Sequence, residues 1–314
     1  MAKALFTVYV VFTVASTVVF MLCGMSFLIA ADHAFATIAT GGFSPYNNSV
    51  AHFDSPVVEC CLSFFMLISS ANFGMYVAAW KKGCKVILGD TEFRVYLSIV
   101  AISTAAMALN LVLAQQWDGI EALRQAFFQS VSISSSTGFV SNDFEQWPVF
   151  SKFILLVLMF IGGGPGSCAG GIKIVTFRLL VGYVVAQVRG DRQIVFHKRG
   201  VPPENLTRAL TLFLLYTLSI FFSVFLLTIT ENGILHRVEG QSMAFVNLLF
   251  EVVSAQGTVG LSVNLTPQLT SEGKCILIFN MFAGRVGLLS LLLALRSLQP
   301  KKAYAYAESQ LPVG

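Results

Sequence analysis

The chain has 314 residues, of which 55% are hydrophobic and only 11% are charged, and its mean hydropathy is +0.74. Ordinary globular proteins carry about 25% charged residues, so this composition excludes a soluble globular domain and indicates an integral membrane protein. The net charge of +4 does not indicate nucleic-acid binding, because the basic residues lie at the ends of apolar runs and form no face with interleaved aromatic residues.

Six apolar runs follow one another along the chain. Each reaches or exceeds the ~20 residues that cross ~30 Å of hydrocarbon as a helix. A shorter, semi-polar helix that ends at a glycine is expected between the two members of each successive pair. The runs lie near residues 4–30, 57–80, 93–114, 150–187, 208–230 and 275–296.

The positions of Lys and Arg predict the orientation of these spans. Most of the basic residues fall at Lys3, in the connections 81–94 and 178–208, and after residue 295, whereas the alternate connections hold only Lys152, Arg237 and Lys274. Cytoplasmic loops carry the excess of Lys and Arg, so both termini are expected in the cytoplasm.

The first apolar run also resembles a secretory signal, because Lys3 precedes it and the small residues Ala30 and Ala31 end it. The apolar core of a signal is only 7 to 15 residues long, and this run leads straight into the first of three glycine motifs. A retained helix is therefore expected.

One pattern recurs between the runs of each pair. A polar residue is followed seven positions later by a hydroxyl residue, and two positions after that by a glycine with a bulky apolar neighbour. The glycines lie roughly a hundred residues apart, a spacing that indicates internal repeats. The three copies are His33, Thr40, Gly42 and Phe43; Gln129, Ser136, Gly138 and Phe139; and Glu251, Thr258, Gly260 and Leu261.

This chemistry predicts a pore lining. Irregular backbone at membrane depth is tolerated only where protein or a water-filled cavity satisfies it. Glycine lets the backbone turn its carbonyl oxygens inward, and rings of carbonyls replace the hydration shell of a cation. His33, Gln129 and Glu251 are expected to tie each loop to its helices rather than to touch the ion. Ordinary tight turns are the alternative, and they explain the glycine but not the fixed polar position.

The segment 162–171 predicts a helix that breaks inside the membrane. It holds six glycines and Pro165, and proline removes a backbone donor while each glycine costs ~1 kcal/mol relative to alanine. A phosphate-binding loop does not fit, because Lys173 follows Ile172 without the glycine-lysine-hydroxyl order. A nucleophile elbow does not fit either, because Pro165 and Ala169 flank Ser167 where glycines are required.

Arg285 lies within the last apolar run, where a charge costs at least ~2.5 kcal/mol on insertion scales. It therefore needs an inward face and a partner. The functional interpretation is an electrostatic barrier that bonds the carbonyls of the glycine loop, and the alternative is a structural arginine that bonds helix ends.

An intramembrane enzyme is the competing class, and it requires a nucleophile with a base or a metal cluster. The four histidines lie in separate segments without metal-ligand spacing. Free thiols are expected for the six cysteines, because adjacent Cys60 and Cys61 are poor disulfide partners. These residues are His33, His52, His197 and His236, and Cys23, Cys60, Cys61, Cys84, Cys168 and Cys275. We therefore expect no enzyme and no cofactor in this chain.

Five motifs together resemble the Trk/Ktr/HKT superfamily of potassium transporters, in which helix, pore helix, filter and helix repeat four times around one pore. "TGGFS", "STGFVS" and "TVGLS" resemble its selectivity-filter segments. "IGGGPGSCAGGIKI" (161–174) is similar to its intramembrane loop, and "NMFAGRVGLLSL" (280–291) to its last helix, which carries a pore arginine. The resemblance implies an all-α fold of repeats around a pseudo-fourfold pore and transport of K+ as the ion.

The resemblance also implies the site residues. Backbone carbonyls of the filter are expected to bind potassium, and the loop with Arg285 is expected to gate the pore. The implied filter residues are Thr40, Gly41, Gly42, Phe43, Ser136, Thr137, Gly138, Phe139, Thr258, Val259, Gly260 and Leu261; the implied gate residues are Gly162, Gly163, Gly164, Pro165, Gly166, Ser167, Cys168, Ala169, Gly170, Gly171 and Arg285.

The order of motifs matches repeats two, three and four of the family, so the first repeat is missing. Residues 1–89 correspond to repeat two, 90–199 to repeat three with its loop, and 200–314 to repeat four. Three quarters of a pore cannot close, which keeps two alternatives open: a truncated, non-conducting subunit or remnant, and a member that passes both sodium and potassium.

By the same resemblance the chain is expected in the bacterial inner (plasma) membrane, in contact with lipid, as a homodimer on a cytosolic nucleotide-binding regulatory subunit like those of the Trk and Ktr systems. The basic connection from Arg189 to Arg208 is a candidate docking surface for that subunit. No nucleic-acid partner is expected.

Overall fold

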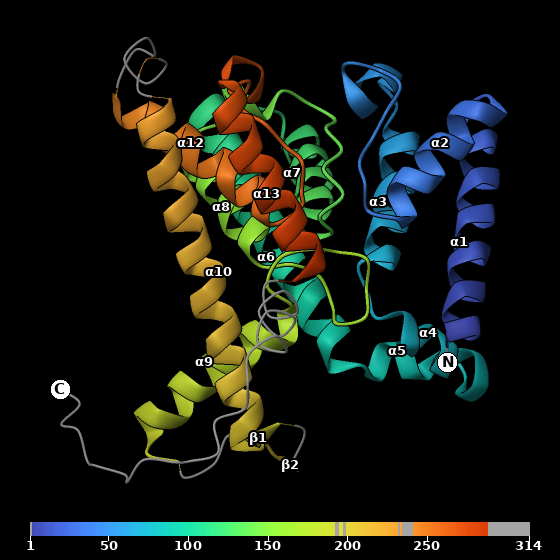
Figure 1. Cartoon of the computed structure of the whole chain (residues 1–314). Coiled ribbons are helices and arrows are strands. Elements are labelled where there is room, and N and C mark those ends of the chain that lie inside the picture. Colours follow the sequence, from blue (N-terminus) through green and yellow to red (C-terminus); the bar gives the residue numbers. More distant parts are fainter. Residues whose placement is uncertain (1, 192–194, 197–198, 232, 234–240, 288–314) are drawn as a thin grey trace, which may run out of the picture.

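The computed structural model describes residues 2–191, 195–196, 199–231, 233 and 241–287. Within these residues the fold is helical apart from one antiparallel pair of two-residue strands, as the all-α prediction expects (Figure 1). The helices are α1 (Ala2–Leu22), α2 (Phe27–Ile38), α3 (Pro56–Ser69), α4 (Phe73–Lys82), α5 (Lys85–Gly89), α6 (Thr91–Gln115), α7 (Gly119–Ser134), α8 (Val149–Phe160), α9 (Ile174–Arg189), α10 (Pro203–Thr230), α12 (Gln241–Gln256) and α13 (Ser271–Val286); the strands are β1 (Val195–Phe196) and β2 (Arg199–Gly200).

Three helices are long and apolar enough to cross a membrane by themselves, namely Lys3–Leu22, Thr91–Gln115 and Pro203–Thr230. The second and third agree with the predicted runs at 93–114 and 208–230. The prediction of one span over 4–30 is wrong, because α1 ends at Leu22 and Gly24, with a φ of +96°, turns the chain into the separate helix α2. Only glycine adopts such a backbone without a steric penalty.

The predicted run over 57–80 is present as two helices that together are long and apolar enough to span, but they are bent. Helices α3 and α4 are bent by 88° at residues 70–72. The hydroxyls of Ser69 and Ser70 bond back to the carbonyls of Met66 and Leu67, and Asn72 starts the new helix by accepting a hydrogen bond from the amide of Gly74 at 2.8 Å. Side chains of this kind offer the backbone an alternative to the helix and favour caps.

The predicted break within 150–187 is present. Helix α8 ends at Phe160 and α9 begins at Ile174, and the segment between them returns on itself, with the amide of Gly162 donating to the carbonyl of Ile172 at 2.8 Å. We call residues 162–171 the glycine loop. Helix α13 covers 271–286 of the last predicted run. The rest of that run lies outside the described residues, as do His197, His236, Arg192, Lys198, Arg237, Arg296, Lys301 and Lys302.

Two buried apolar clusters divide the protein. One joins α6, α7 and α8 to α10, α12 and α13 around Leu155 and Leu248, and the other joins α1, α2 and α3 to α6 and α7 around Phe20 and Phe128. Lipid tails are as apolar as these side chains, so burial gives little net drive for helices to associate in a membrane. Polar contacts between helices therefore matter more here than in a soluble core.

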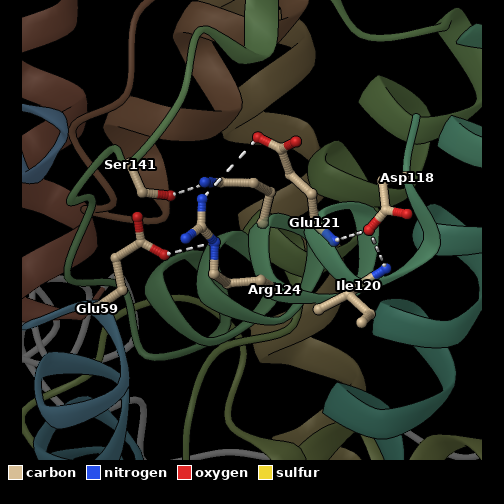
Figure 2. A network of polar contacts seen from close by, with 7 residues as sticks. Glu59, Asp118, Ile120, Glu121, Arg124 and Ser141 are labelled. Atoms are coloured by element: carbon tan, nitrogen blue, oxygen red, sulfur yellow. Dashed lines mark hydrogen bonds and ion pairs between the residues drawn. The ribbon is translucent and has the colours of Figure 1, made fainter. Parts of the chain in front are cut away.

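An ion pair joins the two halves at the boundary between α3 and α7. Figure 2 shows Glu59 of α3 facing Arg124 of α7, and the carboxylate lies 3.4 Å from the guanidinium. Glu59 is only 5% exposed, although it lies in the first turn of a membrane helix. On the same face of α7, the hydroxyl of Ser141 donates to the side-chain oxygen of Gln125 at 2.6 Å. Arg124 also lies 3.9 Å from Glu121, which is half exposed.

Replacing Glu59 by Gln should lower the unfolding temperature of the purified chain, because Arg124 is then left without its partner, a change that costs about 1–3 kcal/mol. The double variant Glu59→Gln, Arg124→Gln should recover part of this loss. Glu121→Gln is the matched control and should change stability by at most about 0.5 kcal/mol. Equal effects of Glu59→Gln and Glu121→Gln in a thermal melt would contradict the role of this pair.

Candidate functional site

The three glycine motifs adopt one backbone conformation. Helices α2, α7 and α12 end at Ile38, Ser134 and Gln256, two residues before the hydroxyl residue of each motif. The hydroxyl residues have left-handed φ angles of +53° at Thr40, +57° at Ser136 and +55° at Thr258, and the motif glycines have φ angles of +66°, +83° and +85°.

Left-handed backbone is rare for residues other than glycine, and it is an outlier for a β-branched threonine. A single residue of this kind costs roughly 1–2 kcal/mol. The same strained position occurs at the end of three helices that are far apart in the sequence. Strain that recurs in this way marks a built feature, because the surrounding structure must hold it in place each time.

The amides of each motif point back to the preceding helix. Gly41 donates to the carbonyl of Ala36 at 2.7 Å, Thr137 donates to that of Ser132 at 2.9 Å, and Val259 donates to that of Ser254 at 2.9 Å. These bonds satisfy both the motif amides and carbonyls near the helix ends. The hydrogen-bond donors of the motifs are thus directed into the protein.

The polar residues nine positions before the glycines hold two of the loops as expected. His33 lies 3.1 Å from the hydroxyl of Ser44, and Glu251 accepts hydrogen bonds from the hydroxyl of Ser262 at 2.5 Å and the amide of Val263 at 3.0 Å. Ser44 and Ser262 occupy the same place in their motifs, two residues after the glycine.

The second copy differs from the other two. The corresponding position is Val140, which has no side-chain hydroxyl, and the Nε2 atom of Gln129 is buried without a hydrogen-bond partner among the described residues. In this copy the loop is bonded instead through Gln125, which lies one helical turn before Gln129, and Ser141, which follows Val140. The sequence pattern alone missed Gln125, although its spacing of one turn from Gln129 puts both on one face of α7.

The motifs pack on one another in a fixed order. A Cβ atom on Gly42 would lie 1.8 Å from the carbonyl oxygen of Thr137, and one on Gly138 would lie 2.0 Å from the carbonyl oxygen of Val259. Each glycine therefore lies against the residue that precedes the next motif glycine. Gly260 breaks this series, because a Cβ atom there would meet no described atom within 4 Å.

Alanine at Gly42 or Gly138 should destabilise the chain more than alanine at Gly260. All three substitutions carry the backbone cost of a left-handed residue, roughly 1–2 kcal/mol, but only the first two also force a side chain into a neighbouring carbonyl. Thermal unfolding of the three purified variants measures the difference. A Gly260→Ala variant that melts as low as Gly42→Ala would contradict the packing order.

The glycine loop touches the hydroxyl residues of all three motifs. The hydroxyl of Thr40 donates to the carbonyl of Cys168 at 3.1 Å, and the amide of Gly170 donates to the hydroxyl of Ser136 at 3.1 Å. A Cβ atom on Gly170 would lie 2.1 Å from the hydroxyl oxygen of Thr258. The middle of the loop therefore lies against the point where the three motifs meet.

Arg285 has the partner that its position required. Its Nη1 atom donates to the carbonyl of Cys168 at 2.7 Å, and its Nη2 atom donates to the carbonyl of Ala39 at 3.3 Å. One carbonyl, that of Cys168, thus accepts from both Arg285 and Thr40. The arginine links α13 to the glycine loop and to the end of α2.

A second cation, Lys173, bonds the same loop through the carbonyl of Ala169. A cavity of about 420 Å³ lies beside these contacts and is lined by the loop together with Lys173, Tyr216, Gln256 and Arg285. In the sequence, Lys173 served only as evidence against a phosphate-binding loop. A lysine two residues after a glycine run at membrane depth was the signal, because such a charge needs a partner.

This arrangement, in which three short helices end in strained loops that contact one glycine loop, defines a helical membrane protein with internally repeated motifs. A family model described as "TrkH: Cation transport protein" matches residues 1–306. The chain belongs to this family, which is one of cation transport proteins and not of enzymes.

Relatives of known name agree with this assignment. The chain is 32% identical to the Trk system potassium uptake protein TrkH of Salmonella typhimurium, over 93% of this chain and 60% of the relative. It is 30% identical to the Ktr system potassium uptake protein B of Bacillus subtilis, over 81% of this chain and 57% of the relative. The crystal structure of the potassium transporter TrkH from Vibrio parahaemolyticus is similar with a TM-score of 0.82 at 29% identity, over 95% of this chain and 64% of that one.

The chain therefore spans about 60% of the length of the relatives that it matches.

Proposed function

We propose that this chain forms three quarters of a potassium-conducting pore in a cell membrane. The observation that carries the proposal is the repeated left-handed pair at the hydroxyl and glycine of each motif, with Gly42 and Gly138 packed on the motif that follows each of them. Backbone carbonyls of the segments 40–43, 136–139 and 258–261 are the proposed potassium ligands. The amides of Gly41, Thr137 and Val259 bond back to their helices, and carbonyl oxygens are the groups that bind a cation in such a pore. The carbonyl of Phe139 also accepts a hydrogen bond from the hydroxyl of Ser132 at 2.7 Å.

The proposed selectivity follows from the relatives, whose printed names specify potassium uptake. Gly42, Gly138 and Gly260 are compatible with it, because no side chain at these positions disturbs the carbonyls. A pore that also passes sodium is the alternative.

A fourth motif segment completes the proposed pore. Gly42 and Gly138 each lie against the following motif, and the open side of Gly260 is the position where the next segment in the series belongs. We assign residues 1–89, 90–199 and 200–314 to three successive repeats and place the fourth at this open side. Without it the chain is a non-conducting membrane subunit, which is the second candidate function.

The glycine loop and Arg285 are the proposed gate. The loop carbonyls of Cys168 and Ala169 are held by two cations, Arg285 and Lys173, and the loop backbone lies against the three motif hydroxyls. A potassium ion that leaves the motifs would meet this backbone and two positive charges. Conduction therefore requires the loop to move away and the arginine to release Cys168.

Orientation and partners are proposed on the distribution of charge. Helices α4 and α5, which carry Lys81, Lys82 and Lys85, lie at the same end of the fold as the N-terminus, which is the proposed cytoplasmic side (Figure 1). A homodimer in the bacterial inner membrane and a cytosolic nucleotide-binding regulatory subunit, docked on the connection from Arg189 to Arg208, complete the proposal.

The proposal is tested in a chimera. The part of the Salmonella typhimurium protein that this chain does not match is fused to this chain. Potassium uptake is measured in cells that lack their own uptake systems, with the unfused chain in parallel. Potassium uptake by the chimera, with none by the unfused chain, supports the proposal that this chain forms part of a pore. No uptake by a chimera that folds and reaches the membrane would favour the non-conducting subunit.

In the conducting chimera, Arg285→Ala should raise the potassium flux per folded protein several-fold, because the bond to Cys168 and the positive charge are both lost. One tenfold step in rate corresponds to about 1.4 kcal/mol of barrier, about the net value of one hydrogen bond to a charged group. Selectivity between potassium and sodium should not change, because the motifs are intact.

Arg285→Lys is the matched control, since it keeps the charge but loses the planar fork of donors that bonds the carbonyls of Cys168 and Ala39. The amount of folded protein is measured by size-exclusion chromatography. A flux that does not rise after correction for this amount would assign Arg285 a structural role only.

A further inference from the structure

A groove lies between the first turns of α1 and the pair α4 and α5, away from the glycine motifs. Its volume is about 490 Å³, and its lining is mostly apolar, with Lys81 as its charged member. Residues on both sides of the groove include Val8, Val11, Phe12, Val77, Trp80 and Ile87. The contact of Tyr76 with Phe12, whose ring centroids lie 5.0 Å apart, fixes the distance between α1 and α4.

Helix α4 has the position of an interfacial helix. It leaves α3 at 88°, and Figure 1 shows α4 and α5 running across the base of α1 and α3, beside the N-terminus. A helix perpendicular to a membrane span lies in the plane of the membrane, at the level of the lipid headgroups. The groove therefore opens where acyl chains meet headgroups.

The end of α4 carries the side chains that membrane interfaces favour. Trp80 is 83% exposed, and Lys81, Lys82 and Lys85 are exposed around it. No carboxylate lies within ion-pair distance of these three lysines in the part of the chain that the structure describes. Tryptophan and lysine are enriched at the headgroup level, and basic clusters there attract anionic lipids.

We propose that this groove binds an anionic phospholipid, with an acyl chain between α1 and α4 and the headgroup phosphate at Lys81, Lys82 and Lys85. An acyl chain accounts for the apolar lining, and a negative charge accounts for three lysines without an acidic partner. A free phosphate ion would leave the apolar groove unfilled.

The lipid site is linked to the glycine loop through the bend between α3 and α4. The amide of Gly164 donates to the carbonyl of Ser70 at 2.9 Å, and the amide of Phe73 donates to the carbonyl of Gly166 at 3.4 Å. The first residues of α4 and the first limb of the loop are thus one backbone-bonded unit. A lipid that holds α4 in the membrane plane stabilises this limb of the loop, and this step rests on the proposed gate.

The binding step is tested with the full chain by native mass spectrometry. The chain is purified with phosphatidylglycerol or with phosphatidylcholine, and the retained lipids are counted. Each lysine near an anionic lipid strengthens binding roughly fivefold, so phosphatidylglycerol should be retained at least roughly tenfold better. The triple variant Lys81→Gln, Lys82→Gln, Lys85→Gln should lose this preference.

The matched control is Lys152→Gln, Lys274→Gln, which removes lysines from the opposite end of the spans and should keep the preference. Ala79→Leu, which fills the groove, should reduce retention of both lipids. Equal retention of the two lipids by the unaltered chain, or a preference that survives the triple variant, would overturn the site.

The link is tested by hydrogen exchange in nanodiscs of the same two lipids. Phosphatidylglycerol should slow exchange at residues 73–82 and at 162–171 in the unaltered chain but not in the triple variant. Slower exchange at 73–82 alone would overturn the link to the loop and leave the lipid site standing. Neither measurement needs ion flux, so failure of the proposed pore and failure of the lipid site are distinguishable.

Discussion

The structure depends on the direct approach of one stretch of backbone to another at membrane depth. Gly42 lies against the carbonyl of Thr137, Gly138 lies against that of Val259, and Gly170 lies against the hydroxyl of Thr258. Non-helical backbone in a membrane must find its hydrogen bonds within the protein. The motif amides bond back to their own helices, and the glycine loop bonds to motif hydroxyls and to Arg285.

The carbonyl of Cys168 is the atom at which several of these segments are bonded together. It accepts from the hydroxyl of Thr40 and from the guanidinium of Arg285, and so connects a motif, the glycine loop and α13 at one atom. The other limb of the loop is bonded to the bend at Ser70 and Phe73. The glycine loop is therefore bonded to Thr40 and Arg285 at one limb and to the α3–α4 bend, next to the proposed lipid site, at the other. Movement of either group of partners changes the hydrogen bonds of the loop.

Gly260 differs from Gly42 and Gly138, which lie against the backbone of another motif. Its backbone is strained like that of Gly42 and Gly138, yet no described atom lies where a side chain would point. Strain of this kind persists where the surrounding structure holds it, and a neighbouring segment would supply that support. Gly260 thus has the same backbone as the other two motif glycines but different surroundings among the described residues.

The sequence by itself determined the membrane class, two long spans, the three motifs with their equal internal offsets, the break at residues 162–171 and the need of Arg285 for a partner. These follow from composition, local period and the cost of a charge or of glycine in a helix, which are properties of short segments. Only the tertiary structure decided the bend at 70–72, the bond of Lys173, the pair of Glu59 with Arg124 and the order in which the motif glycines pack. The ion pair and the packing of the motif glycines join residues far apart in the chain. The bend and the bond of Lys173 to Ala169 are local in sequence, but no local pattern records which backbone carbonyl a folded chain brings to a given glycine or cation.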